Sequence, residues 1–169
     1  YLEASYNRWI VTASRPAGHV LNIVRRDDPR NGRTGWSFAE RAYNFDSAAG
    51  INYTVDVTKP YGSRIVITTM ADGRPFNFGE TYNVAMTSYR ANGGGGLLAE
   101  AGIDTDTISE RTVEYYPEIR EILYDYLRKN RVIDPAVIGD PAVIGHWSFV
   151  PEKVAGPAIE RDLELMFGR

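Results

Sequence analysis

Few residues of this chain have the types and spacing that catalysis needs. The sequence contains no cysteine, which removes thiolate nucleophiles, thiolate metal sites and disulfides. Its two histidines, His19 and His146, are far apart in sequence, whereas a pair of metal ions needs a cluster of His, Asp and Asn side chains. Ser63 and Ser88 have no neighbouring base that would activate a hydroxyl. The sequence therefore predicts no catalytic residue and no metal ligand, and it predicts structural roles for both histidines.

Aromatic residues near glycines are better candidates for a functional site. Tyr43 and Phe45 are two positions apart, so their side chains point to the same side if the segment is extended. Tyr89 precedes Asn92, which is followed by a run of four glycines that begins with Gly93 and Gly94. Two aromatic rings can hold a flat base between them, at ~1–3 kcal/mol per stacked base. Glycines allow a ligand to approach backbone N–H groups closely.

The glycine run matches neither of two common phosphate-binding loops. It is not closed by the Gly-Lys-Ser or Gly-Lys-Thr of a P-loop. It is not surrounded by a strand–helix–strand unit of ~30 residues with a downstream acidic residue, as a dinucleotide-binding loop would be. A ligand-contacting loop and a flexible turn both remain open as interpretations.

Alternating and β-branched residues predict a mixed, mostly antiparallel sheet. Four segments have the composition of strands, namely Ile51–Val57, Arg64–Met70, Thr81–Tyr89 and Trp147–Pro151. Their short connections favour antiparallel neighbours. Asp72 and Gly73 give a hairpin signal, after which residues 74–78 are expected to pair back. Asp104 and Asp106, each followed by a threonine, predict a loop that leads to a helix cap.

Helices are expected to flank this sheet, which gives an α+β fold. The helical segments predicted from the apolar spacing are 1–13, 97–101, 119–130 and 159–169, and Pro117 lies near the start of the third. The charged segment 25–35 predicts a surface loop, and residues 134–145 contain a six-residue tandem duplication that is too short for a solenoid. No linker divides the chain, so we expect residues 1–169 to form one domain. Because it starts inside an amphipathic helix, the domain is expected to be truncated at its N-terminus.

Composition and charge narrow the class of ligand. Hydrophobic residues make up 43% and charged residues 24% of the chain, which is typical of a globular protein. The formal net charge of −3 gives no positive field that would attract nucleic acid polymers. No apolar run approaches the ~18–20 residues of a membrane helix, so we expect no membrane span.

Two stretches of the sequence together resemble a known family. The first is Tyr43–Asp56 (YNFDSAAGINYTVD), continued by Thr58–Ile65 (TKPYGSRI), and the second is Tyr82–Gly96 (YNVAMTSYRANGGGG). In this order and spacing they resemble the C-terminal domain of 5′-nucleotidases and of the related 2′,3′-cyclic-nucleotide 2′-phosphodiesterases/3′-nucleotidases. The resemblance covers roughly residues 1–150.

The resemblance implies how substrate would be held. In the family the C-terminal domain binds base and sugar, with one aromatic ring from the first motif and one from the segment before the glycine loop. Phe45 and Tyr89 match these positions, and Tyr43 is the reserve candidate. Asn92 would hydrogen-bond the base edge or the sugar hydroxyls, and Gly93 and Gly94 would lie beside the ligand.

The resemblance also implies what lies outside this chain. An N-terminal metallophosphoesterase domain of the same protein would bind two divalent metal ions and cut the phosphate ester, so the chain itself would need no cofactor. Its ligand would be a nucleoside or nucleotide, with a purine expected, and its role would be in nucleotide catabolism. Members of the family are typically exported, so we expect a periplasmic or cell-surface location.

Two features depart from the family pattern. Gly95 occupies the place where many 5′-nucleotidases have an aspartate that contacts the ribose, which brings the chain closer to the cyclic-phosphodiesterase branch. The family's arginines that bind sugar and phosphate lie upstream of Tyr1, so their roles do not transfer to Arg8 or Arg90.

The alternative function is a non-catalytic module that binds another ligand or a protein, which predicts no nucleoside affinity. A self-contained enzyme is disfavoured because the sequence shows no credible set of nucleophile or metal ligands.

Overall fold

The computed structural model describes residues 1–11, 19–134 and 145–168. Six of its elements are α-helices, namely α1 (Leu2–Trp9), α2 (Ser88–Ala91), α3 (Leu97–Glu100), α4 (Ile108–Arg111), α5 (Ile119–Asn130) and α7 (Glu152–Phe167). The strands are β1 (Ile23–Asp28), β2 (Arg33–Phe38), β3 (Ile51–Asp56), β4 (Ile65–Met70) and β5 (Trp147–Val150). Three short 3₁₀ turns are η1 (Ala42–Asn44), η2 (Gly94–Gly96) and η3 (Thr105–Thr107). The tandem duplication lies almost wholly outside the described residues.

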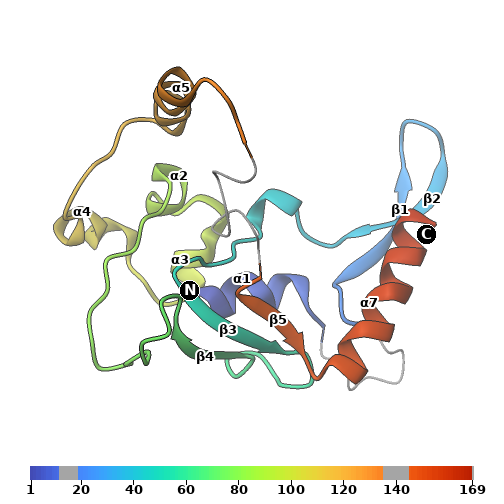
Figure 1. The fold of residues 1–169 in the computed structure, drawn as a ribbon. Coiled ribbons are helices and arrows are strands. Elements are labelled where there is room, and N and C mark those ends of the chain that lie inside the picture. Colours follow the sequence, from blue (N-terminus) through green and yellow to red (C-terminus); the bar gives the residue numbers. More distant parts are fainter. Residues whose placement is uncertain (12–18, 135–144, 169) are drawn as a thin grey trace.

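A three-stranded mixed sheet with strand order β4–β3–β5 forms the centre of the fold (Figure 1). β3 is antiparallel to β4, with Tyr53 opposite Ile67, and parallel to β5, with Tyr53 opposite Trp147. These strands confirm the ones predicted at residues 51–57, 64–70 and 147–151. Helices with mixed and antiparallel sheets confirm the α+β class.

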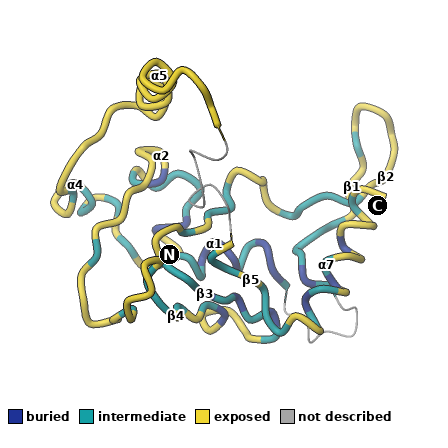
Figure 2. Tube along the Cα trace, in the orientation of Figure 1, coloured by how far each residue is buried: buried dark blue, intermediate teal, exposed yellow. Residues whose placement is uncertain are grey.

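The core lies between this sheet and two helices, α1 and α7, where most of the dark blue residues of Figure 2 are found. Tyr6 of α1 is fully buried, and its hydroxyl is 2.8 Å from that of Tyr53 on β3. Burial, together with this hydrogen bond, raises the pKa of Tyr6 above its ordinary value. The Glu3 carboxylate also accepts the backbone N–H groups of Arg64 and Ile65, at 2.6 and 2.8 Å. Helix α1 is thus fixed to the chain at the start of β4.

The first helix is shorter than predicted. It ends at Trp9 rather than at residue 13, because Ile10 adopts extended backbone angles and forms an antiparallel bridge with Leu21. The next residue, Val11, donates its backbone N–H to Val20 O at 2.8 Å. β-branched residues favour such pairing, so a tertiary contact overrides the helical spacing.

The surface loop predicted at residues 25–35 is wrong, because these residues lie in the β1–β2 hairpin. The two strands pair antiparallel from Ile23 opposite Phe38 to Asp28 opposite Arg33. The Asp28 carboxylate accepts the backbone N–H of Arg30 at 2.9 Å and so closes the turn. Most side chains of the outer part of the hairpin are exposed, which removes the apolar alternation that identifies a strand.

The other predictions have mixed outcomes. The strand predicted at residues 81–89 is wrong, since 81–87 have no regular structure and Ser88 begins α2, capped by the Thr87 side chain. The return of residues 74–78 is limited to one bridge, Thr69 to Pro75. The terminal helix begins at Glu152 and not at residue 159, because Gly156 and Pro157, which the sequence presents as breakers, lie inside it.

Helices α3 and α5 are confirmed, the latter with the predicted bounds. Leu97 and Leu98 of α3 are buried. In contrast, the apolar face of α5 is 39–59% exposed along its length, and Figure 2 shows the whole helix as exposed. Among the described residues, no helix is long and apolar enough to cross a membrane.

Candidate functional site

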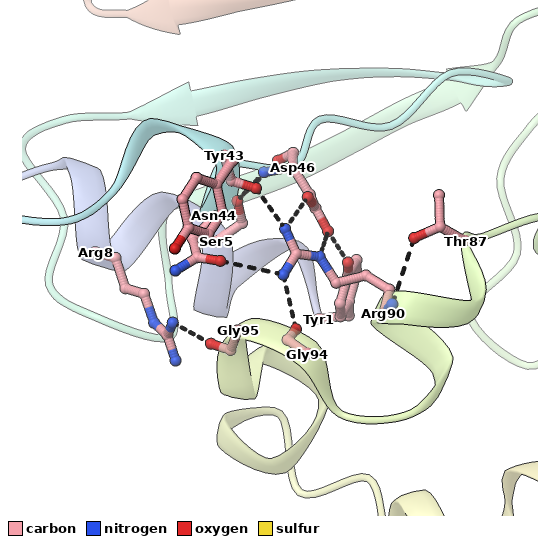
Figure 3. Close-up of polar contacts among 10 residues, drawn as sticks. All are labelled: Tyr1, Ser5, Arg8, Tyr43, Asn44, Asp46, Thr87, Arg90, Gly94 and Gly95. Atoms are coloured by element: carbon pink, nitrogen blue, oxygen red, sulfur yellow. Dashed lines mark hydrogen bonds and ion pairs between the residues drawn. The ribbon is translucent and has the colours of Figure 1, made fainter.

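The two sequence motifs meet in space. The first contributes η1 and the residues up to Asp46, and the second contributes α2 and the glycine turn Gly93–Gly96. Figure 3 shows that Arg90 of α2 lies between them. Tyr1, which precedes α1, and Ser5 of α1 also bond to Asp46.

Arg90 is the link between the motifs. Its side chain is only 7% exposed, and it forms a two-pronged ion pair with Asp46, with Nε and Nη2 each 2.7 Å from a carboxylate oxygen. It also donates to the backbone oxygens of Tyr43, at 3.0 Å, and Gly94, at 2.7 Å. Paired hydrogen bonds of this kind fix direction as well as distance. Removal of one partner from a buried ion pair costs ~3–5 kcal/mol.

Asp46 is itself held by α1. The Tyr1 hydroxyl donates to its carboxylate, and the Ser5 hydroxyl both donates to Asp46 O, at 2.8 Å, and accepts from Asp46 N, at 2.7 Å. The Asp46 carboxylate accepts hydrogen bonds from Tyr1, which precedes α1, and from Arg90 of α2, so it has little freedom to move. The ion pair with Arg90 is therefore anchored to the first turns of α1.

The glycine turn is required by its own geometry. Gly93, Gly95 and Gly96 have φ values of 84°, 76° and 69°, in the left-handed region that favours glycine. A Cβ on Gly94 would lie 2.6 Å from the Tyr89 ring, and one on Gly95 would lie 2.6 Å from Asn44 Oδ1. The turn packs closely on both motifs.

The candidate base-binding rings differ in their surroundings. Phe45 is half-buried and packs edge-on against Tyr6 and Trp9, with ring centroids 5.1 and 5.3 Å apart. Tyr89 and Tyr43 are 53% and 60% exposed. The Tyr89 ring centroid is 5.3 Å from the Arg90 guanidinium. Phe45 therefore belongs to the edge of the core, whereas the two tyrosines present ring surface to solvent.

One exposed cation lies beside the two tyrosines. Arg41 donates to the Tyr43 hydroxyl at 2.6 Å and lies 5.9 Å from the centre of that ring. The hydrogen bond with Tyr43 is the main cause that raises the pKa of Arg41 above its ordinary value. Asn92, which follows α2, is exposed, and its backbone N–H bonds to Ser88 O at 2.9 Å.

The other polar residues singled out in the sequence have structural partners among the described residues. No group of three or more His, Cys, Asp or Glu side chains in that part of the chain could hold a metal ion. His19 bonds to the fully buried Asp162 of α7, and His146 bonds to the backbone oxygen of Ala48. Asp104 caps η3 by accepting the Asp106 N–H at 3.0 Å. These contacts stabilise the fold. The aromatic surface formed by the exposed rings of Tyr43 and Tyr89 is left as the candidate site.

Sequence reasoning missed the residues that build this site. Asp46 and Arg90 belong to the two motifs, but they are 44 positions apart, and no spacing rule links such a pair. Arg8, which donates to Gly95 O and pairs with Glu100 at 2.9 Å, gave no signal either. The only signal for the Asp46–Arg90 ion pair would have been that one motif contains an aspartate, the other an arginine, and that the two motifs must meet in space.

Comparison with known proteins identifies the class of this fold and site. The sequence model of the 5′-nucleotidase C-terminal domain matches residues 18–101, a range that contains Asp46, Arg90 and the glycine turn. The chain belongs to this family of C-terminal domains of nucleotidases and phosphoesterases.

The sequence is also similar to a named phosphoesterase. The chain is 30% identical over 134 residues to the trifunctional nucleotide phosphoesterase protein YfkN of Bacillus subtilis strain 168. The match covers 73% of this chain and spans only 8% of the relative's length. No solved structure matches the chain.

Proposed function

We propose that this chain binds the nucleoside part of a nucleotide for a metal-dependent phosphoesterase. The observation that supports this most is Tyr89, an exposed ring held between a guanidinium and a closely packed glycine turn. A fixed, exposed aromatic face is what base stacking needs, because every base presents a flat π surface. A flexible ring would lose conformational entropy on binding, whereas this one is already confined.

The second ring of the site is a choice between two candidates. Phe45 matches the family position, but it packs edge-on into the core. Tyr43 is more exposed, and its backbone oxygen bonds to the same Arg90 that neighbours Tyr89. We propose Tyr89 as the first platform and retain both Phe45 and Tyr43 for the second. Asn92 would bond the base edge or sugar, and Gly93 and Gly94 would offer backbone contacts.

The hydrolytic step would belong to another part of the protein. We propose an N-terminal metallophosphoesterase domain, with two divalent metal ions, that cuts 5′-nucleotides or 2′,3′-cyclic nucleotides in nucleotide catabolism. The name of the Bacillus relative, a nucleotide phosphoesterase, supports the substrate class. Export to the periplasm or cell surface is part of the proposal, and the cysteine-free sequence is compatible with it.

The proposal is tested by calorimetric titration of the 169-residue chain with adenosine, AMP and ribose 5-phosphate. Adenosine and AMP should bind, and ribose 5-phosphate, which lacks a base, should not. If ribose 5-phosphate bound as tightly as AMP, recognition would depend on the phosphate and the stacking proposal would be wrong. If none of the three bound, the alternative of a non-catalytic module for another ligand or a protein would be favoured.

A further inference from the structure

The Arg90 guanidinium has no donor left for a ligand. An arginine has five N–H donors, and the Arg90 side chain has five contacts with acceptors: two with the Asp46 carboxylate, one each with Tyr43 O and Gly94 O, and a long one of 3.5 Å with Asn44 Oδ1. These acceptors come from both motifs. All donors of Arg90 are therefore bonded to protein acceptors, and none is free to bind a phosphate.

We propose that Arg90, held by Asp46, is a positioning residue that sets the Tyr89 ring and the Gly93–Gly96 turn in their binding geometry. This inference rests on the proposed function and names the pair of residues that builds its site. Arg90 would act on the ligand only through Tyr89 and the turn, without touching it.

The contacts explain how the pair would control the ring. Tyr89 precedes Arg90 in α2, and the Arg90 side chain bonds to Gly94 O within the turn. Gly94 lies so close to the Tyr89 ring that a Cβ there would be 2.6 Å away. The ring is thus bounded by the guanidinium and by the backbone that the guanidinium fixes. Loss of the Arg90 bond to Gly94 would free both the turn and the ring.

A lysine could not replace this arginine. Lysine keeps the positive charge, but it has a single ammonium group in place of the planar fork that spans a carboxylate. It could pair with Asp46 or reach the backbone oxygen of Gly94, but it could not hold both in the observed directions. Arg90→Lys therefore separates positioning from charge, and Asp46→Asn tests the other partner with little change in size.

The test compares Arg90→Lys, Asp46→Asn, their double variant and a control, Asp162→Asn. Asp162 is a buried aspartate that accepts the backbone N–H groups of Val20 and Leu21, remote in the fold from the glycine turn. Three quantities are measured on the 169-residue chain: the Kd for AMP, the stability towards urea, and hydrogen exchange at the Gly93 and Gly96 amides, which bond to Arg90 O and Gly93 O.

Both single variants should weaken AMP binding by at least ~10-fold, which corresponds to ~1.4 kcal/mol, and should speed exchange at the two glycine amides. The double variant should be little worse than either single one, because residues in one ion pair are not additive. Asp162→Asn should lower stability and leave both the Kd and the glycine exchange unchanged.

Three results would count against the inference. Arg90→Lys with the parent Kd and parent glycine exchange would overturn it. So would a loss of affinity in Asp162→Asn that matches its loss of stability, since the effect would then be general. If the parent chain does not bind AMP, the proposed function fails, and exchange decides the positioning role alone: unchanged exchange in both variants rejects it.

Discussion

Tyr89 combines exposure with confinement at the scale of a single residue. Half of the residue is open to solvent, yet Gly94 leaves no room for a Cβ on one side of the ring. The φ of Gly94 is not in the left-handed region, unlike the φ of Gly93, Gly95 and Gly96. A substitution at Gly94 therefore tests close packing against the Tyr89 ring and backbone oxygen without the strain of a left-handed φ.

Gly94→Ala should push the Tyr89 ring or the turn out of place. Overpacking of this kind typically costs ~1–3 kcal/mol, and nucleoside affinity should fall with it. Gly35→Ala is the matched control, because its Cβ would meet nothing within 4 Å and its φ is not positive. Urea unfolding and an adenosine titration of both variants check this. Equal stability and affinity in the two variants would show that the ring is not confined by Gly94.

The buried hydroxyl of Tyr6 makes stability depend on pH. Burial, followed by the hydrogen bond to Tyr53, raises the pKa of Tyr6, so the unfolded chain loses this proton before the folded chain does. The contribution of Tyr6 is complete below ~pH 10, the ordinary value for tyrosine, and is lost as the pH rises above it. The free energy of unfolding should therefore fall in this range.

Tyr6→Phe should remove part of this dependence. The variant should lose about 1 kcal/mol at neutral pH, because one buried hydrogen bond is absent, and its stability should fall less steeply above ~pH 10. Urea titrations of parent and variant at several pH values measure both effects. If the free energy of unfolding fell equally steeply with pH in the two proteins, Tyr6 would not be the cause of the loss of stability above ~pH 10.

At the scale of elements, the sequence predicts those strands and helices whose apolar residues recur regularly on one face. β3, β4 and β5 each pack against the core, so their pattern is visible, and α5 has a full amphipathic stripe. The β1–β2 hairpin was missed because most of its outer side chains face solvent on both sides. Helix α7 was predicted too short, because Gly156 and Pro157 are ordinarily breakers and here lie inside a packed helix. In α7 the deciding factor was tertiary packing, which a local pattern does not contain.

The same limit applies to the candidate site. Tyr89 and the glycine run could be predicted, since they form a local motif. The Arg90–Asp46 pair could not, because its partners are distant in sequence and either residue alone resembles a surface charge. The half-buried position of Phe45 depends on Tyr6 and Trp9 of another element, so its exposure could not be read from the motif either.

Helices α3 and α5 should contribute differently to stability. Leu98 of α3 is buried, and Leu123 of α5 is 55% exposed. Leu98→Ala should cost ~2–5 kcal/mol, as for other buried leucines, whereas Leu123→Ala should change the free energy of unfolding by less than ~0.5 kcal/mol, as at ordinary surface positions. Denaturant unfolding of both variants measures this. A large loss in Leu123→Ala would show that the face of α5 is covered in solution.

At the scale of the whole molecule, the site lies at the edge of the core and depends on it. Tyr1, which precedes α1, and Ser5 of α1 hold Asp46, and Asp46 holds Arg90. The ligand surface is therefore linked to the helix that packs on the sheet. The net charge of −3 adds no general attraction for phosphates. Binding is therefore expected to depend on the local aromatic surface.

The most direct test of the central claim is a chemical-shift titration of the 169-residue chain with adenosine, repeated with Tyr89→Ala, Phe45→Ala and Tyr43→Ala. The account predicts saturable shifts at the glycine turn in the parent chain and their loss in Tyr89→Ala. Of the other two variants, the one that weakens binding without loss of fold identifies the second ring. Saturable binding that survives in Tyr89→Ala with the parent affinity would contradict the account.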